Sequence, residues 1–250
     1  MSVTIKSQRE IELMRHAGKL LGQTLKQLEE AVRPGMSTWE LNQIGEEIIR
    51  GYGCIPSFLN YNGYPASICI SLNDEVVHGI PRKDRFVENG DIVSLDFCLS
   101  YKGYQSDCAR TLAIGEISDD AKQLIEVTKQ CFFEGIKYAK EGCHLYQISA
   151  AINDYADKFG YGVVRDLVGH GIGREMHEDP QIPNFRQRRR GMKLQAGMTL
   201  CIEPMINMGK PDIFIDSDDG WTTLTEDGYP SAQWEYTVLV TENGIEILTH

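Results

Sequence analysis

The sequence has no uninterrupted hydrophobic run long enough to cross a bilayer, so we expect no membrane partner. Residues 1–19 are charged and carry a helical pattern, without the apolar centre that a secretory signal peptide needs. We therefore expect a cytoplasmic protein. Basic residues are also scarce, with 25 Lys and Arg against 36 Asp and Glu, and the formal charge of −11 argues against general nucleic-acid binding.

The chain lacks the usual patterns of disulfide, zinc-knuckle and covalent-catalysis proteins. Its seven cysteines are odd in number and include no Cys-x-x-Cys pair, which favours buried thiols in a reducing compartment. No G-x-S-x-G motif occurs and no cysteine stands in a recognisable Cys/His motif, so a covalent nucleophile is the weaker hypothesis.

What is present is enough apolar residues for a core, and one informative hairpin. With 250 residues and 42% hydrophobic content, the chain can bury a substantial core. In residues 90–110, two apolar-rich runs flank a short break that contains Gly103, a pattern typical of a β-hairpin. A two-residue loop at Lys102 and Gly103 puts Asp96 and Asp107 on one strand face as diagonal neighbours. Moving the turn by one residue makes them direct partners on that same face.

Two carboxylates on a partly apolar strand face repel and desolvate each other, and a bound metal ion between them would relieve both costs. The alternative is that one aspartate caps the turn while the other is solvated on an open face. The hairpin alone does not decide between these interpretations.

The second half of the chain repeats the order of the first. Each half predicts a long helix, a shorter helix and then strands, with halves of about residues 1–116 and 117–250. A shift of 107 residues places Gly35 on Gly142 and Asp96 on Glu203. We expect a single catalytic domain over residues 1–250, in which the halves pair around a pseudo-twofold axis and form one continuous sheet backed by helices.

The repeat also predicts a counterpart of Asp107. The strand pattern of residues 231–238 supplies it as Glu235. An insertion of about 20 residues, at 208–227, replaces the tight turn in this half, and we expect its Trp221 to overhang the site.

A glycine-rich segment, residues 169–180, lies between the two carboxylate pairs and carries His170. It does not match the dinucleotide pattern G-x-G-x-x-G, because Arg174 occupies the position of the third glycine. Four carboxylates and one imidazole suit a pair of divalent ions such as Mn, Fe, Co or Zn. The five candidate ligands are Asp96, Asp107, His170, Glu203 and Glu235. His78 and His177 lie outside this set; each is either a structural histidine or a group that acts on the substrate.

The motifs together resemble the type I methionine aminopeptidases of the short bacterial kind, over essentially the whole chain. The matching segments are residues 73–81, the hairpin from Ser94 to Asp107, residues 169–180, residues 202–205 and residues 231–237. The resemblance implies the α+β pita-bread fold, with a curved, mostly antiparallel sheet. It also implies a dinuclear metallo-exopeptidase that removes the N-terminal methionine of nascent proteins, preferring a small second residue.

The resemblance assigns a role to each matching residue. Asp96 would chelate one metal ion, Asp107 and Glu235 would bridge both, and His170 and Glu203 would hold the other. A metal-bridging hydroxide would attack the scissile carbonyl, with Glu203 as proton acceptor, His177 at the carbonyl oxygen and His78 at the amide nitrogen. Together with these two histidines, the methionine pocket would be lined by Tyr61, Tyr64, Cys69, Met176 and Trp221.

The sequence departs from this family at two positions. Tyr236 follows Glu235 where histidine is common, so we expect an altered environment for that carboxylate. Phe58 stands where the short bacterial enzymes often have cysteine, which predicts a tighter or more apolar pocket rim. Neither position is a candidate ligand, and activity is still expected.

Two other functions remain open from the sequence. An Xaa-Pro peptidase of the same fold is disfavoured, because those relatives usually carry an extra N-terminal domain. A binding module that has lost catalysis is disfavoured because all five candidate ligands are present. A basic cluster, made of Arg186, Arg188, Arg189, Arg190 and Lys193, is either a solvated loop or a contact to ribosomal RNA near the exit tunnel. We expect a monomer.

Overall fold

The computed structural model describes residues 3–250. Its helices are α1 (Gln8–Ala31), α2 (Thr38–Gly51), the short 3-10 helix η1 (Tyr61–Gly63), α3 (Asp119–Ile136) and α4 (Leu145–Asp157). Its strands are β1 (Ile55–Pro56), β2 (Cys69–Leu72), β3 (Glu75–Val77), β4 (Ile92–Tyr101), β5 (Tyr104–Ala113), β6 (Gly162–Val163), β7 (Gly169–Gly171), β8 (Glu178–Ile182), β9 (Thr199–Ile202), β10 (Met205–Asn207), β11 (Ile213–Ile215), β12 (Thr223–Thr225), β13 (Ser231–Val240) and β14 (Ile245–Ile247).

The hairpin of β4 and β5 has the register that the sequence predicts. Tyr101 pairs with Tyr104, so the loop consists of Lys102 and Gly103. Both loop residues have positive φ, at 50° and 79°, which is the backbone of the two-residue turns that match strand twist. Asp96 therefore lies opposite Ala109, and the two aspartates share a face as diagonal neighbours.

The main sheet shows the predicted duplication in its strand order. It has 11 strands, and its central path runs β1-β4-β5-β13-β9-β7-β8. The two long strands β5 and β13 pair antiparallel at the middle, with β4 outside one and β9 outside the other. Each half thus contributes an inner and an outer strand to the junction, which places the pseudo-twofold axis between β5 and β13.

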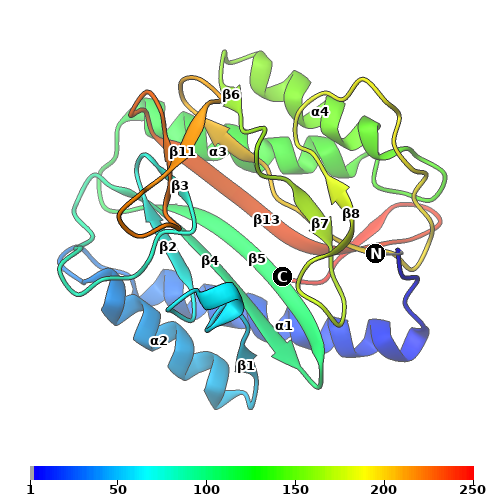
Figure 1. Ribbon diagram of the computed structural model, residues 1–250, viewed down its shortest axis with the longest axis horizontal. Coiled ribbons are helices and arrows are strands. Elements are labelled where there is room, and N and C mark those ends of the chain that lie inside the picture. The colour runs from blue at the N-terminus through cyan, green and yellow to red at the C-terminus, as the bar shows by residue number, and fades with distance from the viewer. Residues whose placement is uncertain (1–2) are drawn as a thin grey trace.

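Helices cover one face of this sheet: Figure 1 shows α1 behind β4 and β5 and α3 behind β13, while α2 packs against α1 and α4 against α3. The periodic apolar stripe of α1, which includes Leu21, Leu25 and Leu28, packs with Leu95 and Phe97 of β4. A second cluster joins α3 and α4 to β9 and β13. Because one sheet face is filled by these helices, the other face is left to form the site.

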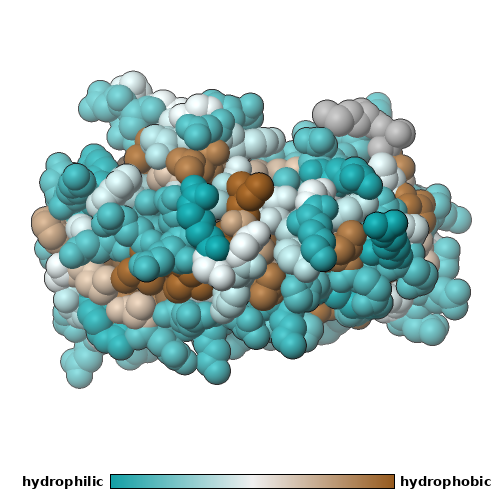
Figure 2. Space-filling model, turned by 90° about the horizontal axis from the view of Figure 1, so that it is seen from below, coloured by the Kyte–Doolittle hydropathy of each residue, from teal (hydrophilic) through white to brown (hydrophobic). Residues whose placement is uncertain are grey.

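The helix ends follow the sequence signals. Ser7 and Glu10 form a capping box at the start of α1, and Ser37 and Glu40 form one at the start of α2. Within residues 3–250, none of the helices is both long and apolar enough to span a membrane. Figure 2 shows a face of the molecule covered mainly by hydrophilic residues, with small separate apolar patches.

The insertion of the second half forms a small sheet of its own. Strands β11 and β12 pair with each other, and β12 pairs with β3 of the first half. Trp221, just before β12, lies on the wall of the main cavity. The insertion therefore brings a side chain to the site, as the sequence predicts.

The fold makes a prediction about the contact between α1 and the C-terminal residues. A Cβ added at Gly18 would lie 2.2 Å from the carbonyl oxygen of Leu248, whereas one added at Gly51, at the end of α2, would meet nothing within 4 Å. We expect Gly18→Ala to lower the free energy of unfolding by about 1–3 kcal/mol. Gly51→Ala should leave it equal or raise it by roughly 0.4–1 kcal/mol. Urea unfolding of both variants measures this difference, and equal effects would contradict the close packing at Gly18.

Candidate metal centre and active site

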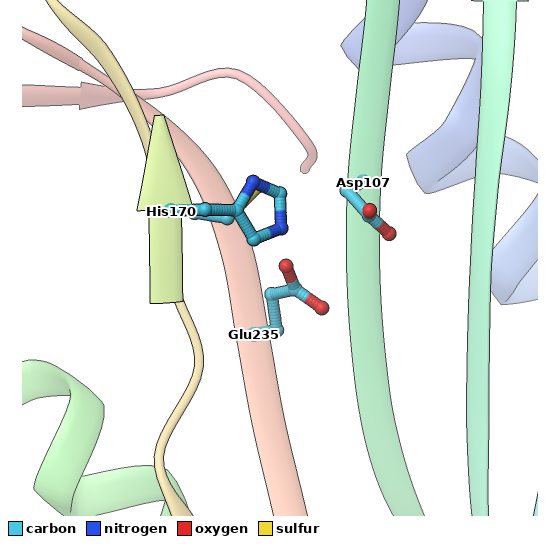
Figure 3. Close-up of side chains that lie close together, drawn as sticks. Asp107, His170 and Glu235 are labelled. Carbon is cyan, nitrogen blue, oxygen red and sulfur yellow. The ribbon is translucent and has the colours of Figure 1, made fainter. Parts of the chain in front are cut away.

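Three carboxylates meet on the open face of the sheet where its halves join. Asp96 lies on β4, Asp107 on β5 and Glu235 on β13, and all three are buried. Glu235 pairs across the junction with Ala109, which shares the face of both aspartates. Figure 3 shows Asp107 and Glu235 extending from neighbouring strands toward the same space as the ring of His170.

The remaining two candidate ligands come from the far side of β13. His170 lies on β7, and Glu203 follows directly after β9. The Nε2 of His170 is 3.5 Å from a carboxylate oxygen of Glu203. The Nδ1 of His170 lies 2.9 Å from the carbonyl oxygen of Gly171. Nδ1 therefore carries the proton in the neutral ring, which leaves the lone pair of Nε2 facing the carboxylates.

Burial dominates the electrostatics of the cluster. It raises the pKa of Asp107 to about 7. Burial, followed by repulsion from Asp107, raises the pKa of Asp96 and of Glu235 well above the usual range. For Glu203, burial and then the charges of Asp96 and Asp107 raise the pKa in the same direction. Without a cation, these four carboxyl groups therefore resist being charged together.

The donor set fits a divalent metal ion. Three buried carboxylate oxygens, one each from Asp96, Asp107 and Glu235, have no hydrogen-bond partner. Within residues 3–250, the residues that line the cavity include no lysine or arginine to balance the charge. Burial, and then the neighbouring His177, lowers the pKa of His170 to about 3, which keeps its imidazole neutral and able to coordinate.

A cavity of about 460 Å³ opens from the carboxylates, and every residue predicted for the site lines it. Its wall is rich in aromatic and sulfur-containing side chains. Tyr64 and Trp221 pack edge to face with ring centroids 5.2 Å apart. The predicted pocket residues along this wall are Tyr61, Tyr64, Cys69, Met176 and Trp221.

The two histidines outside the ligand set also face the cavity. The rings of His170 and His177 are 4.2 Å apart between centroids, and the Nδ1 of His177 lies 2.8 Å from the hydroxyl of Tyr61. His78 has a positive φ of 60°, a conformation that a non-glycine residue adopts only where its surroundings hold it. Burial, and then His177, lowers the pKa of His78 to about 4, so this ring is neutral near pH 7.

The structure adds residues that the sequence reasoning missed. A ligand atom of Cys201 lies within 4.8 Å of those of Asp107, His170 and Glu235. Gln233 lines the cavity, and its side-chain oxygen has no hydrogen-bond partner. A signal was available for both, because Cys201 stands two residues before Glu203 and Gln233 two before Glu235, so strand alternation predicts the same face.

The two departures from the family pattern have different outcomes. Phe58 lines the cavity, as its expected place at the pocket rim requires. Tyr236 is expected from the sequence to alter the environment of Glu235. Because side chains alternate along β13, Tyr236 lies on the helix face of the sheet, opposite the face that carries Glu235. There its hydroxyl accepts a 2.7 Å hydrogen bond from Arg110, and its ring packs on Phe132 of α3.

Buried carboxylates, a neutral histidine and an adjoining pocket define a metal-dependent enzyme of the hydrolase type. The comparison with protein families then gives the particular group. The sequence pattern of Metallopeptidase family M24 matches residues 12–242, and the chain belongs to this family.

Individual relatives agree with this assignment. The methionine aminopeptidase of Clostridium acetobutylicum is 52% identical over 247 residues, which cover 99% of this chain and 98% of the relative. The crystal structure of methionine aminopeptidase from Rickettsia prowazekii superimposes with a TM-score of 0.97 at 40% identity, with all of both chains covered. A Xaa-Pro dipeptidase from Bacillus anthracis reaches a TM-score of 0.80 at 28% identity, and 61% of its chain is covered. The fold is the pita-bread fold that these enzymes share.

The carboxylate cluster predicts how the stability of the metal-free protein depends on pH. In the folded protein the Asp107 carboxyl, whose pKa is raised to about 7, keeps a proton that the same carboxyl releases at about pH 4 in the unfolded chain. The free energy of unfolding should therefore fall as pH rises from about 4 to about 7. Urea titrations of metal-free wild type and Asp107→Asn measure this dependence. The variant should lose less stability over that range, and an identical decline in both proteins would contradict the assignment.

Proposed function

We propose that this protein is a metal-dependent methionine aminopeptidase that removes the N-terminal methionine of nascent proteins and prefers a small second residue. The observation that supports this most strongly is the position of the five candidate ligand side chains in one pocket that is also lined by aromatic and sulfur-containing groups. The family and the names of the relatives agree with this function.

The proposed site holds two divalent ions, of Co, Mn, Fe or Zn. The side chains that would hold these ions are Asp96, Asp107, His170, Glu203 and Glu235. Bound divalent ions lower the pKa of water and polarise a carbonyl group, which is the chemistry that amide hydrolysis needs. The unpartnered oxygens of Asp96, Asp107 and Glu235 support this assignment.

Three side chains act on the substrate in this proposal. Glu203 accepts a proton, a role that suits a carboxyl whose pKa is raised by burial. His177 donates a hydrogen bond to the carbonyl oxygen from Nε2, because its Nδ1 is engaged with Tyr61. His78 would lie at the scissile amide nitrogen, with its positive-φ backbone held in place by its surroundings.

The remaining pocket residues select the methionine side chain. An unbranched thioether is flexible and polarizable, and it makes favourable contacts with aromatic rings. Tyr64 and Trp221 supply such rings, while Cys69 and Met176 supply apolar sulfur at the buried wall. Tyr61 joins the pocket to His177 through its hydroxyl.

Two further functions are alternatives to this proposal. Hydrolysis of Xaa-Pro bonds uses the same fold, as the likeness to a Xaa-Pro dipeptidase indicates. A catalytically inactive binding module would not need five ligands around one cavity. We also propose that residues 1–250 act as one catalytic domain, as a monomer, in the cytoplasm.

The direct test is peptide hydrolysis by metal-free protein before and after addition of Mn, Fe, Co or Zn. We expect metal-dependent release of methionine from Met-Ala-Ser and no cleavage of Ala-Pro-Ser. Cleavage of the proline peptide instead would keep the site and overturn the substrate. No hydrolysis with any metal would support the binding module.

We further propose that the basic cluster contacts ribosomal RNA near the exit tunnel. Arg188, Arg189 and Arg190 are exposed, whereas Arg186 forms an ion pair with Asp154. Reversal of the three exposed charges to glutamate should reduce co-sedimentation with ribosomes at low salt, because phosphate contacts depend on salt. The activity on a free tripeptide serves as the control and should not change. Unchanged co-sedimentation would show that the cluster is a solvated loop.

A further inference from the structure

The loop that carries His177 and Met176 is held from outside the site. This loop, residues 173–178, connects β7 to the start of β8, and both side chains line the cavity. Its last residue, Glu178, is turned away from the cavity toward the N-terminal segment of the chain. The hydrogen bonds of Glu178 therefore fix the end of the loop immediately next to His177.

One carboxylate oxygen of Glu178 closes the loop on itself. Its Oε1 accepts hydrogen bonds from the backbone N–H of Arg174, at 2.9 Å, and of Glu175, at 3.4 Å. A Cβ added at Gly173 would lie 2.5 Å from this oxygen and 2.5 Å from the Cε of Lys6. The loop thus wraps tightly around the carboxylate, and a side chain at Gly173 would displace Glu178 or Lys6.

The other oxygen joins the loop to the N-terminal segment. Glu178 Oε2 lies 2.6 Å from the Nζ of Lys6 and accepts a 2.7 Å hydrogen bond from the hydroxyl of Thr4. The Lys6 side chain is 5% exposed and that of Glu178 is 11% exposed, so this ion pair is almost fully shielded from water. The backbone N–H of Lys6 donates to the carbonyl oxygen of Gly197 at 2.8 Å, which fixes the segment against the second half of the chain.

A buried ion pair of this kind is a positional constraint, because loss of either partner leaves an unbalanced charge in a shielded place. Here the constraint acts on a loop that presents two cavity-lining side chains. The pKa of the Glu178 carboxyl is lowered, despite burial, by the hydrogen bonds of Lys6 and Thr4. The lowered pKa of Glu178 favours its charged form beside the Lys6 side chain.

We propose that Lys6 and Glu178 are positioning residues for catalysis, and that the N-terminal segment holds His177 and Met176 in place through their ion pair. This inference rests on the proposed function of the cavity. It assigns a task in the active site to a lysine separated from its partner by 172 residues of sequence. The printed hydrogen bonds of the Glu178 side chain go to Thr4, Lys6 and the loop backbone, and Glu178 acts on His170 through its charge alone, so metal binding is expected to persist without the pair.

The test compares Lys6→Met, Glu178→Gln and the double variant with wild type. The double variant removes both charges, which avoids an unpaired buried charge and guards against simple unfolding. A matched control is Arg15→Met with Glu246→Gln. Arg15 and Glu246 also form an ion pair, at 2.6 Å, between the N-terminal helix and a later strand, but neither residue lines the cavity.

We expect the double Lys6/Glu178 variant to lose about 10- to 100-fold in kcat for release of methionine, since small misplacement of a catalytic group has effects of this order. Hydrogen exchange of the backbone amides in residues 173–178 should accelerate in the same variant, whereas the rise in Tm on addition of Mn should stay at its wild-type value. The Arg15/Glu246 control should keep both its kcat and the exchange rates of this loop.

The proposal is overturned if the double Lys6/Glu178 variant keeps the wild-type kcat and loop exchange. It is also overturned if the control loses as much kcat. If wild-type protein releases no methionine, the proposed function fails, and the proposal that rests on it fails with that function. In that case the exchange measurement still decides whether the ion pair orders the loop.

Discussion

The mutual repulsion of buried carboxylates at the centre of one sheet is the constraint on which the rest of the structure depends. Asp96, Asp107 and Glu235 lie on three adjacent strands, β4, β5 and β13, whose opposite face is filled by helices. Such a cluster is costly unless a cation neutralises it. The fold therefore makes a rigid frame whose unfavourable charge density becomes useful when metal ions bind.

Duplication explains how a single chain builds this arrangement. Each half supplies two helices, which cover one face of the sheet, and an inner and an outer strand. In the first half these strands carry Asp107 and Asp96. In the second half the inner strand carries Glu235, and Glu203 directly follows the outer strand. The half that lacks a tight hairpin instead contributes the insertion with Trp221. The repeated strands thus bring four carboxylates together, while His170, the insertion with Trp221 and the loop of His177 are features of the second half alone.

The sequence predicts that the five candidate ligands lie together, and in the structure they line one cavity, because both signals, a hairpin turn and an internal repeat, are readable in the sequence. The register of the hairpin follows from one turn at Lys102 and Gly103, and the positions of Glu203 and Glu235 follow from the repeat. Strand alternation also places Tyr236 on the helix face, away from Glu235, whose environment the family comparison suggested Tyr236 would alter. The contact between Lys6 and Glu178 could not be predicted, because it joins two segments with no shared periodicity and depends on how the loops close in three dimensions.

The measurement that tests this account most directly is anomalous diffraction from crystals of the protein grown with Mn. The account predicts two anomalous peaks in the carboxylate cluster, one beside Asp96 and one beside His170 and Glu203, with Asp107 and Glu235 between them. A cluster without any peak, or a single peak that does not contact the carboxylates of β4 and β5, would contradict the claim that metal ions neutralise this site.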